Sequence, residues 1–575
     1  MAARRRKDGI GRLCAFLRFF AAVWFGAGLA VSQVAGVRAE VGWKEVLKGG
    51  EENRVAIVSG GYDALLLRVH LIRAAKVSVE VQTFIWGNDE CGRLVMWELI
   101  EAARRGVKVR IIADHLFSDQ DPETAAFLAT VHPNLEVRHY RPTMRRIKPT
   151  LTHTIVAGAR SFRGINQRMH NKVMLFDGAV LITGGRNIEN PYFDRATELN
   201  FRDRDVVVAG PAARVAGESF EAYWNFKHVV PSRELGDVAA VIGRGTYRRF
   251  ERKEDWAFGG FFGELDADAE EAGRRFAGKL RAVRRTVFWA DEPGKKRGWF
   301  VGKAARITRE LTGTIKEARE RIVIQTPYLV LSNRARDLFR DVQRERPGLR
   351  IEVSTNSFAA TDNIMAYSAN YRLRNRYVQD LGLRVFEFKP EPAAMAELFP
   401  RHGEMTERAR SLVAAGRQRR MPFLCVHAKS MTIDGRVAFV GSYNLDPRSE
   451  NLNTEVGLLV EDEAFARDLQ AEIEHDMRPE NSWAIARRKL PLKMEVVNGL
   501  VGGVLSLSPL DVWPIQNTSS FELRPGAEPV GMDDPEFYER YEEVGAFPGT
   551  DGLFTTKEIL TRLYKAVGSG LTPVL

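Results

Sequence analysis

The pattern of apolar and polar positions predicts strands that alternate with helices, and the same order occurs twice along the chain. In the first occurrence, IRAAKVSVEVQTFIW predicts a strand over 77–82, GRLVMWELIEAARRG a helix, and VKVRIIAD a strand over 107–114. In the second occurrence, IKEARERIVIQTPYL, RARDLFRDVQRER and LRIEVSTN repeat this order. Alternating strands and helices predict α/β sheets with helical cover. The repetition predicts two similar halves related by a pseudo-twofold axis.

The domain organisation follows from this repeat and from the places where it breaks. The stretch 248–300 is rich in charge and glycine, and Pro, Gly and acidic residues interrupt the pattern near the C-terminus. At 575 residues the chain is too long for one ordinary core. We therefore predict the following segments: a leader over 1–39, a first half over 40–247, a connector with a short helix over 248–300, a second half over 301–490, and a C-terminal extension over 491–575.

The leader has the composition of an export signal. A basic group at Arg4 to Lys7 precedes an apolar stretch that is best from Phe19 to Ser32, and the tripeptide VRA stands directly before Glu40. This arrangement predicts a secretory signal peptide, or a single membrane anchor if it is not cleaved. In both cases the basic flank stays cytoplasmic and the body of the protein is exported.

Composition narrows the function less than the motifs do. The formal net charge is +11, which predicts attraction to a polyanion, either a nucleic acid or an anionic bilayer, and charge alone does not distinguish them. The three cysteines provide no disulfide framework, and no CxxC or His/Cys cluster predicts a zinc site.

Two short motifs carry candidate chemistry. The motifs are HNKVMLFDG, with His170, Lys172 and Asp177, and HAKSMTIDG, with His427, Lys429 and Asp434. Both stand at the start of predicted strands, with apolar residues following. Residues two apart on a strand face the same side, so each histidine and its lysine should project together into one pocket. A single such triplet is compatible with a buried core histidine, but two with matched surroundings indicate a site.

The residues after each motif also match. GGRN ends at Asn187 and GSYN ends at Asn444, so small residues would let the backbone approach a phosphate while the asparagine amide donates a hydrogen bond. Farther on, each half has a carboxylate before an apolar strand, Asp203 and Glu455. Such carboxylates could orient the histidines through Nδ1, or they could be surface acids.

Paired histidines and lysines suit transfer at a phosphodiester. The lysines would neutralise the phosphate oxygens and stabilise the transition state. One neutral imidazole would attack phosphorus and form a phosphohistidine, and the other would protonate the departing alcohol. Because the lysines would take over the electrostatic task of a metal, we predict neither a metal nor another cofactor.

These motifs resemble the phospholipase D superfamily, whose mark is a duplicated His-x-Lys-x4-Asp. MHNKVMLFDGAVLITGGRNI, STNSFAATD and HAKSMTIDGRVAFVGSYNLDPRSENLNTEVGLL are similar to the C-type branch of the bacterial cardiolipin synthases. The resemblance covers most of 55–488. It departs at Asp114-His115, where relatives tend to carry an acidic pair.

The resemblance implies a duplicated α/β/α sandwich with the active site at the seam between the halves. It implies that His170 is the nucleophile and His427 the general acid and base. It also implies that the two motif aspartates are structural supports and that Asp203 and Glu455 brace the histidines.

The implied reaction transfers a phosphatidyl group to phosphatidylglycerol and yields cardiolipin and a small alcohol. The partners would be an anionic bilayer with phosphatidylglycerol, and phosphatidylethanolamine as an alternative donor, at the periplasmic face of the inner membrane. We expect a monomer with two pseudo-equivalent halves and do not expect nucleic acid as a partner. The alternatives are a phospholipid hydrolase, a phosphodiesterase or nuclease acting on DNA, and a non-catalytic lipid-binding protein.

Overall fold

The computed structural model describes residues 42–115, 121–160, 166–256, 258, 262–295, 305–489 and 517–550. All elements named below belong to the compact unit Trp43–Leu575. The predicted leader over 1–39 lies outside the described residues. Among the residues described, no helix is both long and apolar enough to cross a membrane.

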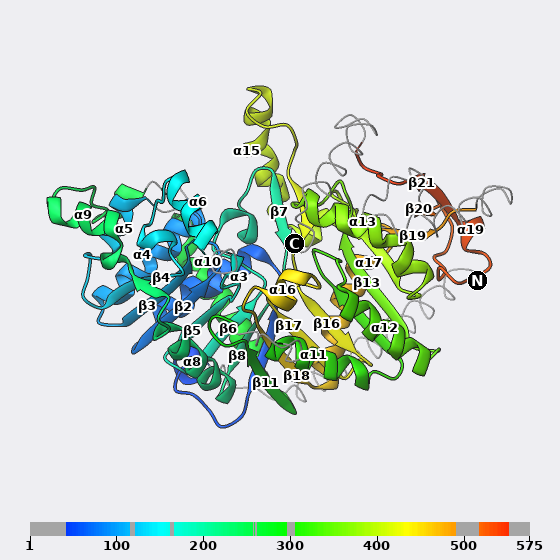
Figure 1. Ribbon diagram of the computed structural model, residues 1–575, viewed down its shortest axis with the longest axis horizontal. Helices are drawn as coiled ribbons and strands as arrows, with labels where there is room; N and C mark the ends of the chain where they lie inside the picture. Colours follow the sequence, from blue (N-terminus) through cyan, green and yellow to red (C-terminus); the bar gives the residue numbers. More distant parts are fainter. Residues whose placement is uncertain are drawn as a thin grey trace, which may run out of the picture. The chain divides into compact units, whose positions relative to one another are not determined.

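The first half is built on a nine-stranded mixed sheet with the order β10-β1-β8-β6-β5-β2-β3-β4-β9 (Figure 1). The strands β2, β3 and β4 run parallel, and their neighbours on both sides run antiparallel. The bounds are β1 Arg54–Val58, β2 Ser78–Thr83, β3 Lys108–Asp114, β4 Leu135–Tyr140, β5 Val173–Phe176, β6 Val180–Gly184, β8 Asp205–Ala209, β9 Val229–Pro231 and β10 Arg281–Ala282.

The second half is built on a ten-stranded sheet with the order β11-β18-β17-β16-β12-β13-β14-β19-β20-β21. From β11 to β19 this order matches that of the first sheet from β1 to β9, strand for strand, which confirms the duplicated α/β fold. The bounds are β11 Arg285–Ala290, β12 Arg321–Gln325, β13 Arg350–Asn356, β14 Arg384–Phe388, β16 Ser430–Ile433, β17 Val437–Gly441, β18 Val456–Glu461, β19 Ser482–Arg487, β20 Thr518–Leu523 and β21 Tyr541–Gly545.

Helices cover both faces of each sheet, and several begin at a capping side chain. For example, Asp89 accepts a hydrogen bond from Gly92 N, and Ser332 accepts one from Ala335 N. The helices of the first half are α2 Trp43–Val46, α3 Gly61–Ala74, α4 Glu90–Arg104, α5 Pro122–Leu128, α6 Leu151–Arg160, α8 Pro211–Trp224, α9 Gly236–Arg244 and α10 Phe262–Lys279. Those of the second half and its extension are α11 Arg306–Glu317, α12 Asn333–Glu345, α13 Ile364–Gln379, α14 Met395–Leu398, α15 His402–Ala414, α16 Pro447–Asn451, α17 Glu463–Met477 and α19 Phe537–Arg540.

The segment 248–300, interpreted from sequence as a connector, contributes to both sheets. Its helix α10 has 18 residues and packs beside α3, its strand β10 pairs with β1, and its strand β11 pairs with β18. Part of the extension over 491–575 joins the second sheet, because β20 pairs with β19 and β21 with β20.

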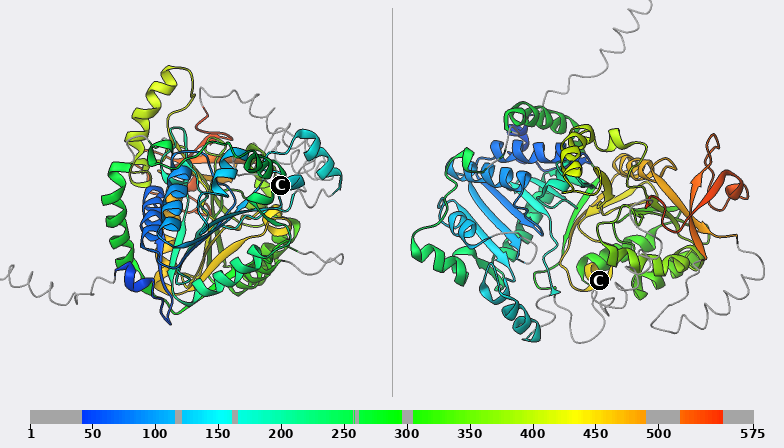
Figure 2. Two further views of the ribbon diagram at one scale, coloured as in Figure 1. Left: turned by 90° about the vertical axis from the view of Figure 1, so that its left-hand side faces the viewer. Right: turned by 90° about the horizontal axis from the view of Figure 1, so that it is seen from above.

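The two halves share a core. One cluster of buried residues combines α8 and strands of the first sheet with α17 and strands of the second, for example Val206, Phe220, Leu458 and Leu469. The right-hand view of Figure 2 shows the blue and cyan strands of the first sheet and the green and yellow strands of the second. Because helices cover both faces, every residue of β5 and of β16 is buried, and no polar-apolar alternation marks them.

Candidate active site

Backbone hydrogen bonds between the two halves hold the two motifs in position. Strand β7 (Leu199–Arg202) pairs in parallel with β15 (Phe423–Val426), which comes directly before the second motif. The amide of His427 donates to Arg202 O at 2.8 Å, and the amide of His170 donates to Thr454 O at 2.9 Å. Each histidine is therefore fixed by the backbone of the other half.

The carboxylate that braces His170 comes from the second half. His170 Nδ1 lies 2.9 Å from Glu455 Oε2, and the Glu455 side chain is completely buried. Two hydroxyl groups hold this carboxylate: Ser442 Oγ donates to Oε2 at 2.5 Å and Ser449 Oγ donates to Oε1 at 2.8 Å. Glu455 is thus fixed on both oxygens while it faces the imidazole.

The carboxylate that braces His427 comes from the first half. His427 Nδ1 lies 2.6 Å from Asp203 Oδ2, and Asp203 Oδ1 accepts the amide of Arg204 at 2.7 Å. A Cβ added at Gly185 would lie 2.1 Å from Asp203 Oδ1, so this glycine makes room for the carboxylate. The interpretation of both acids as braces agrees with this geometry, and the crossing between halves is what the structure adds.

Both lysines lie against their histidines. Lys172 Nζ donates to His170 O at 2.9 Å, and Lys429 Nζ donates to His427 O and lies 3.1 Å from His427 Nε2. Both ammonium groups are buried. Two close cations in a dry site form an electrostatic trap for an anion.

The surroundings hold both imidazoles neutral. Burial and the charges of Lys172 and Lys429 lower the pKa of His170 to about 4, although Glu455 opposes the shift. Burial and Lys429, aided by Lys172, lower the pKa of His427 to about 3 against the opposing effect of Asp203. Each histidine thus responds to the lysine of the other motif, which means that the two motifs share one site.

The same charges act on the lysines and on the bracing acids. Burial and Lys429 bring the pKa of Lys172 well below its ordinary value, and burial brings that of Lys429 to about 8, although nearby carboxylates oppose this. Burial acts to raise the pKa of Asp203 and of Glu455, but their histidine partners and the lysines outweigh burial and lower both. The two carboxylates are therefore ionised acceptors, and each Nδ1 carries a proton.

The motif aspartates lie at the turns after the motif strands, away from the lysines. Asp177 accepts hydrogen bonds from the amides of residues 76, 77 and 78, and Asp434 accepts them from the amides of residues 319, 320 and 321. Both have a left-handed backbone, with φ of 51° and 52°. Their positions suit the structural role that the resemblance implied.

The two asparagines make contacts within the protein. Asn187 Nδ2 donates to Tyr192 OH at 2.8 Å, and its Oδ1 accepts the amide of Ile85 at 3.2 Å. The amide of Asn444 donates to Ser449 Oγ at 3.2 Å, while its buried Oδ1 has no hydrogen-bond partner among the described residues. Asn187 thus links the loops that contain Ile85 and Tyr192, and the side-chain oxygen of Asn444 can still accept a hydrogen bond.

Several contributing residues were not identified from sequence. Ser449 belongs to no motif that could be identified in the sequence. Lys295 donates hydrogen bonds to Ser449 O and, at 2.6 Å, to Asn453 O, but it lies in a stretch that was interpreted as a connector. Asp114, in the dipeptide that departs from relatives, accepts the amide of Met169 at 2.9 Å and so fixes the backbone before His170. Such roles depend on contacts between distant segments.

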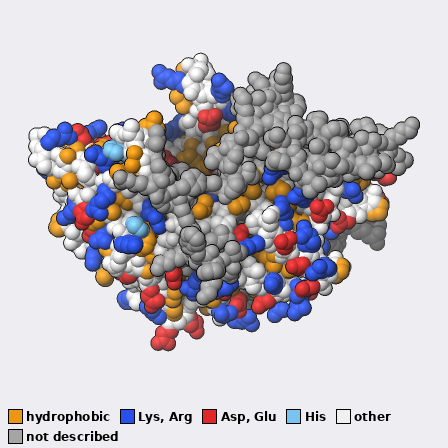
Figure 3. Space-filling view, in the orientation of Figure 1, with side chains coloured by type: hydrophobic (Ala, Val, Ile, Leu, Met, Phe, Trp, Pro, Cys, Tyr) orange, Lys and Arg blue, Asp and Glu red, His pale blue; other side chains and the backbone are white. Residues whose placement is uncertain are grey.

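Aromatic rings complete the walls. The Phe84 ring lies edge-on to His170 at 4.8 Å between centroids, and the Tyr192 ring lies edge-on to His427 at 5.1 Å. Within the described ranges, no group of three or more His, Cys, Asp or Glu side chains has the arrangement of a metal site. On the face drawn in Figure 3, Lys and Arg side chains are interspersed with acids and form no continuous stripe.

Comparisons with known proteins show which proteins this chain is similar to. A family model described as cardiolipin synthase, PLD-like domain, matches residues 69–224 and 311–477. Cardiolipin synthase C of Escherichia coli is 32% identical over 421 residues, which cover 70% of this chain and 80% of that protein. An uncharacterised protein of Helicobacter pylori is 29% identical over 452 residues, 77% of this chain and 82% of that protein. The solved phosphatidylserine synthase of Haemophilus influenzae aligns over 79% of this chain and 93% of its own, with 15% identity and a TM-score of 0.49.

Proposed function

Since this chain belongs to the cardiolipin synthase family with phospholipase D-like domains, we propose that it transfers a phosphatidyl group between phospholipids. The acceptor is the glycerol hydroxyl of phosphatidylglycerol, and the products are cardiolipin and the small alcohol of the donor. One observation carries the proposal: each motif histidine is bonded to a buried carboxylate from the opposite half. This crossing joins both motifs in one site that suits a single phosphorus atom.

In the first step His170 is the nucleophile. Because Glu455 is an ionised acceptor at Nδ1, the lone pair of His170 Nε2 is free to attack phosphorus. The bond from phosphorus to the headgroup oxygen breaks, and His427 gives its Nε2 proton to that oxygen. The result is a phosphatidyl-histidine and a free alcohol.

In the second step the acceptor hydroxyl attacks phosphorus and loses its proton to His427. The bond between phosphorus and His170 breaks, and its electron pair returns to Nε2. His427 is then protonated again for the next donor, so protons and electrons balance over the cycle.

A bound phosphodiester supplies the charge that this cycle needs. Burial and the charges of the two lysines hold the pKa of His427 near 3, which disfavours its protonated form. The phosphate monoanion offsets the lysine charges, and so it raises the pKa of the imidazoles and lysines together. Substrate binding therefore brings about the protonation of His427.

The location of the enzyme is part of the proposal. A phospholipid substrate requires a bilayer, and the basic, apolar leader over 1–39 supports export to the periplasmic face of the inner membrane. The net charge of +11 favours an anionic lipid surface. We propose that the functional unit is a single chain, because both motifs and both braces belong to it.

The test uses the purified protein in phosphatidylglycerol vesicles, with and without phosphatidylethanolamine, and mass spectrometry of the lipids and the released alcohol. The wild type should form cardiolipin, and His170→Ala and His427→Ala should form none. His402→Ala, on α15 away from the motifs, is the control and should be fully active. In base-quenched wild-type protein, a phosphatidyl group should map to the peptide that contains His170, and His170→Ala should carry none.

Other outcomes identify the alternatives. Full activity in either motif variant contradicts the proposal. Phosphatidic acid as the only product, even with excess acceptor, indicates a hydrolase. Degradation of plasmid DNA in EDTA, with the vesicles unchanged, indicates a nuclease. Vesicle binding without turnover of any phosphodiester indicates a non-catalytic protein.

A further inference from the structure

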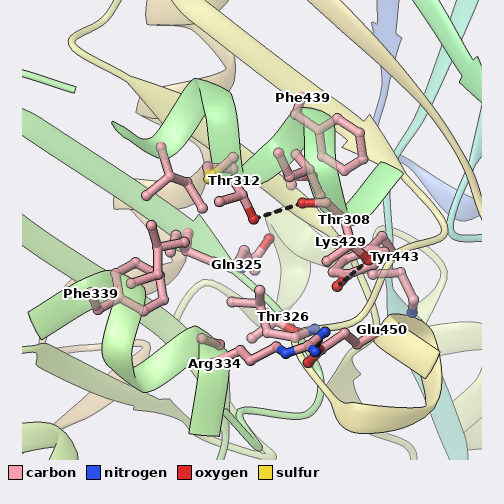
Figure 4. A pocket seen from close by; sticks show the side chains of 18 residues that line it. Thr308, Thr312, Gln325, Thr326, Arg334, Phe339, Lys429, Phe439, Tyr443 and Glu450 are labelled. Atoms are coloured by element: carbon pink, nitrogen blue, oxygen red, sulfur yellow. Dashed lines mark hydrogen bonds and ion pairs between the residues drawn. The ribbon is translucent and has the colours of Figure 1, made fainter. Parts of the chain in front are cut away.

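An apolar pocket lies beside the second motif and has no role in the steps described above. Its volume is about 280 Å³, and it lies between α11, α12 and the face of the second sheet (Figure 4). Its apolar lining comes from both helices and the sheet and includes Leu311, Ile315, Ile324, Leu338, Phe339 and Met431. Sites that bind small molecules are typically apolar with a few polar groups, and most have volumes of roughly 300–1,000 Å³, so this pocket is slightly smaller than most.

The pocket reaches Lys429, one of the two lysines that hold the phosphate in the proposed reaction. Lys429 belongs to its lining and also lies against His427. Lys429 directly precedes β16 and Met431 is the second residue of that strand, and both line the pocket. A molecule with its phosphate at the lysine would therefore meet an apolar wall directly beside it.

Several polar groups of the lining are bonded to each other. Tyr443 OH lies 3.2 Å from Thr308 Oγ1, and Thr312 Oγ1 donates to Thr308 O at 2.7 Å (Figure 4). Arg334 faces Glu450 at 4.0 Å, and Figure 4 shows this pair beside Thr326. A polar headgroup would gain little by displacing these contacts, whereas an alkyl chain needs none of them.

The corresponding region of the first half is filled by charged groups. In the matched motif tail, Arg186 takes the place of Tyr443 and is fully buried. It donates to Val58 O at 2.9 Å and to Asp203 O at 2.6 Å, and Arg68 beside it donates to Asp205 Oδ2 at 2.7 Å. A buried charged network of this kind is hostile to an alkyl chain, so the two halves are not interchangeable.

We infer that the pocket between α11 and α12 binds one acyl chain of the phospholipid whose phosphate lies between the two motifs. The inference rests on the proposed function and deepens it, because it assigns the lipid tail to the second half. The chain enters beside Lys429 and passes over Met431. With a volume of about 280 Å³, the pocket holds only part of a long acyl chain, and the rest of that chain stays in the bilayer.

The test measures kcat/KM against chain length. Phosphatidylglycerols with chains of four, eight and twelve carbons are presented at a fixed mole fraction in one detergent. For the wild type, kcat/KM should rise with length by up to about fourfold per buried methylene and then reach a plateau. Ala335→Phe and Leu338→Trp fill the pocket, and they should lose at least tenfold on the twelve-carbon substrate and under twofold on the four-carbon substrate. An unchanged chain-length profile in both variants overturns the inference.

Controls separate this result from failure to fold and from failure of the proposed function. Asp341→Phe, on the exposed side of α12, should behave as the wild type, and each variant should keep its melting temperature. Leu338→Ala enlarges the pocket and should move the plateau to longer chains, while a plateau at the same length contradicts the inference. If the wild type turns over no phospholipid, the proposed function fails, and thermal shifts decide the pocket alone. Dodecyl phosphate should then raise the melting temperature more than ethyl phosphate does, and Ala335→Phe should abolish the difference. Equal shifts by both phosphates contradict the inference.

Discussion

Replacing Glu455 by glutamine tests the crossed brace with the smallest possible change. The amide keeps the shape of the carboxylate but has one oxygen and one NH2 group. Glu455 accepts from His170 Nδ1 at 2.9 Å, from Ser442 Oγ at 2.5 Å and from Ser449 Oγ at 2.8 Å. If the amide nitrogen faces His170, Nδ1 becomes the acceptor and the proton moves to Nε2, which removes the nucleophilic lone pair.

The magnitude follows from the geometry and the charges. Exchange of an orienting carboxylate for its amide, with geometry intact, costs about 10⁴-fold in kcat in a comparable triad. Loss of the negative charge also removes the contribution by which Glu455 raises the pKa of His170. We expect kcat to fall by about 10³–10⁴, equivalent to about 4–5.5 kcal/mol at about 1.36 kcal/mol per factor of ten. KM should change little, because the Glu455 side chain is completely buried and both of its oxygens are bonded within the protein.

The assay is cardiolipin formation in vesicles, with rapid quenching to measure the phosphohistidine in a single turnover. Glu461→Gln, at the end of the strand that follows Glu455, has its carboxylate paired with surface arginines and should stay within twofold of the wild type. The variant Glu455→Gln/His170→Ala should be no worse than His170→Ala alone, since both changes act on one imidazole. A fall of less than tenfold in Glu455→Gln refutes the brace.

Three further predictions follow from the same site. Because burial lowers the pKa of Lys429 to about 8 and the anion needs its charged form, kcat/KM should fall as the pH rises above about 8. Lys429→Arg should show no such fall, because arginine stays protonated, and a fall shared by both proteins would assign it to another group. Asp434→Ala removes the acceptor of three backbone amides and should lower the free energy of unfolding by about 2–3 kcal/mol. The kcat of the folded protein at 25 °C should stay within threefold of the wild type. Chemical denaturation and steady-state rates check the two values, and a loss of stability below about 1 kcal/mol contradicts a structural role for Asp434. Gly185→Ala would place a Cβ 2.1 Å from Asp203 Oδ1, displace this carboxylate from His427 and reduce kcat at least tenfold. Gly217→Ala, whose Cβ would meet no described atom within 4 Å, should keep full activity, and equal rates for the two variants would refute this reasoning.

The sequence by itself determined the parts of the site that depend on local spacing. His170 and Lys172 lie two apart before a strand, as do His427 and Lys429, and this spacing places each pair on one face without any knowledge of the fold. The repeated order of strands and helices likewise predicted two α/β halves, and the matching strand order of the two sheets confirms it. The supporting role of the motif aspartates was expected only from the family resemblance, not from the spacing.

The pairing of each carboxylate with its histidine depends on how the two halves pack and could not be predicted from the sequence. From sequence, Asp203 and Glu455 stand in the same halves as His170 and His427, respectively, but the pairing of β7 with β15 exchanges them. The pocket between α11 and α12 was equally invisible, because Leu338 and Met431 meet only through packing. The sequence also did not predict that the stretch 248–300 contributes strands to both sheets. Local spacing fixes the direction of a side chain relative to its own backbone, whereas contacts between residues hundreds of positions apart depend on how whole layers pack.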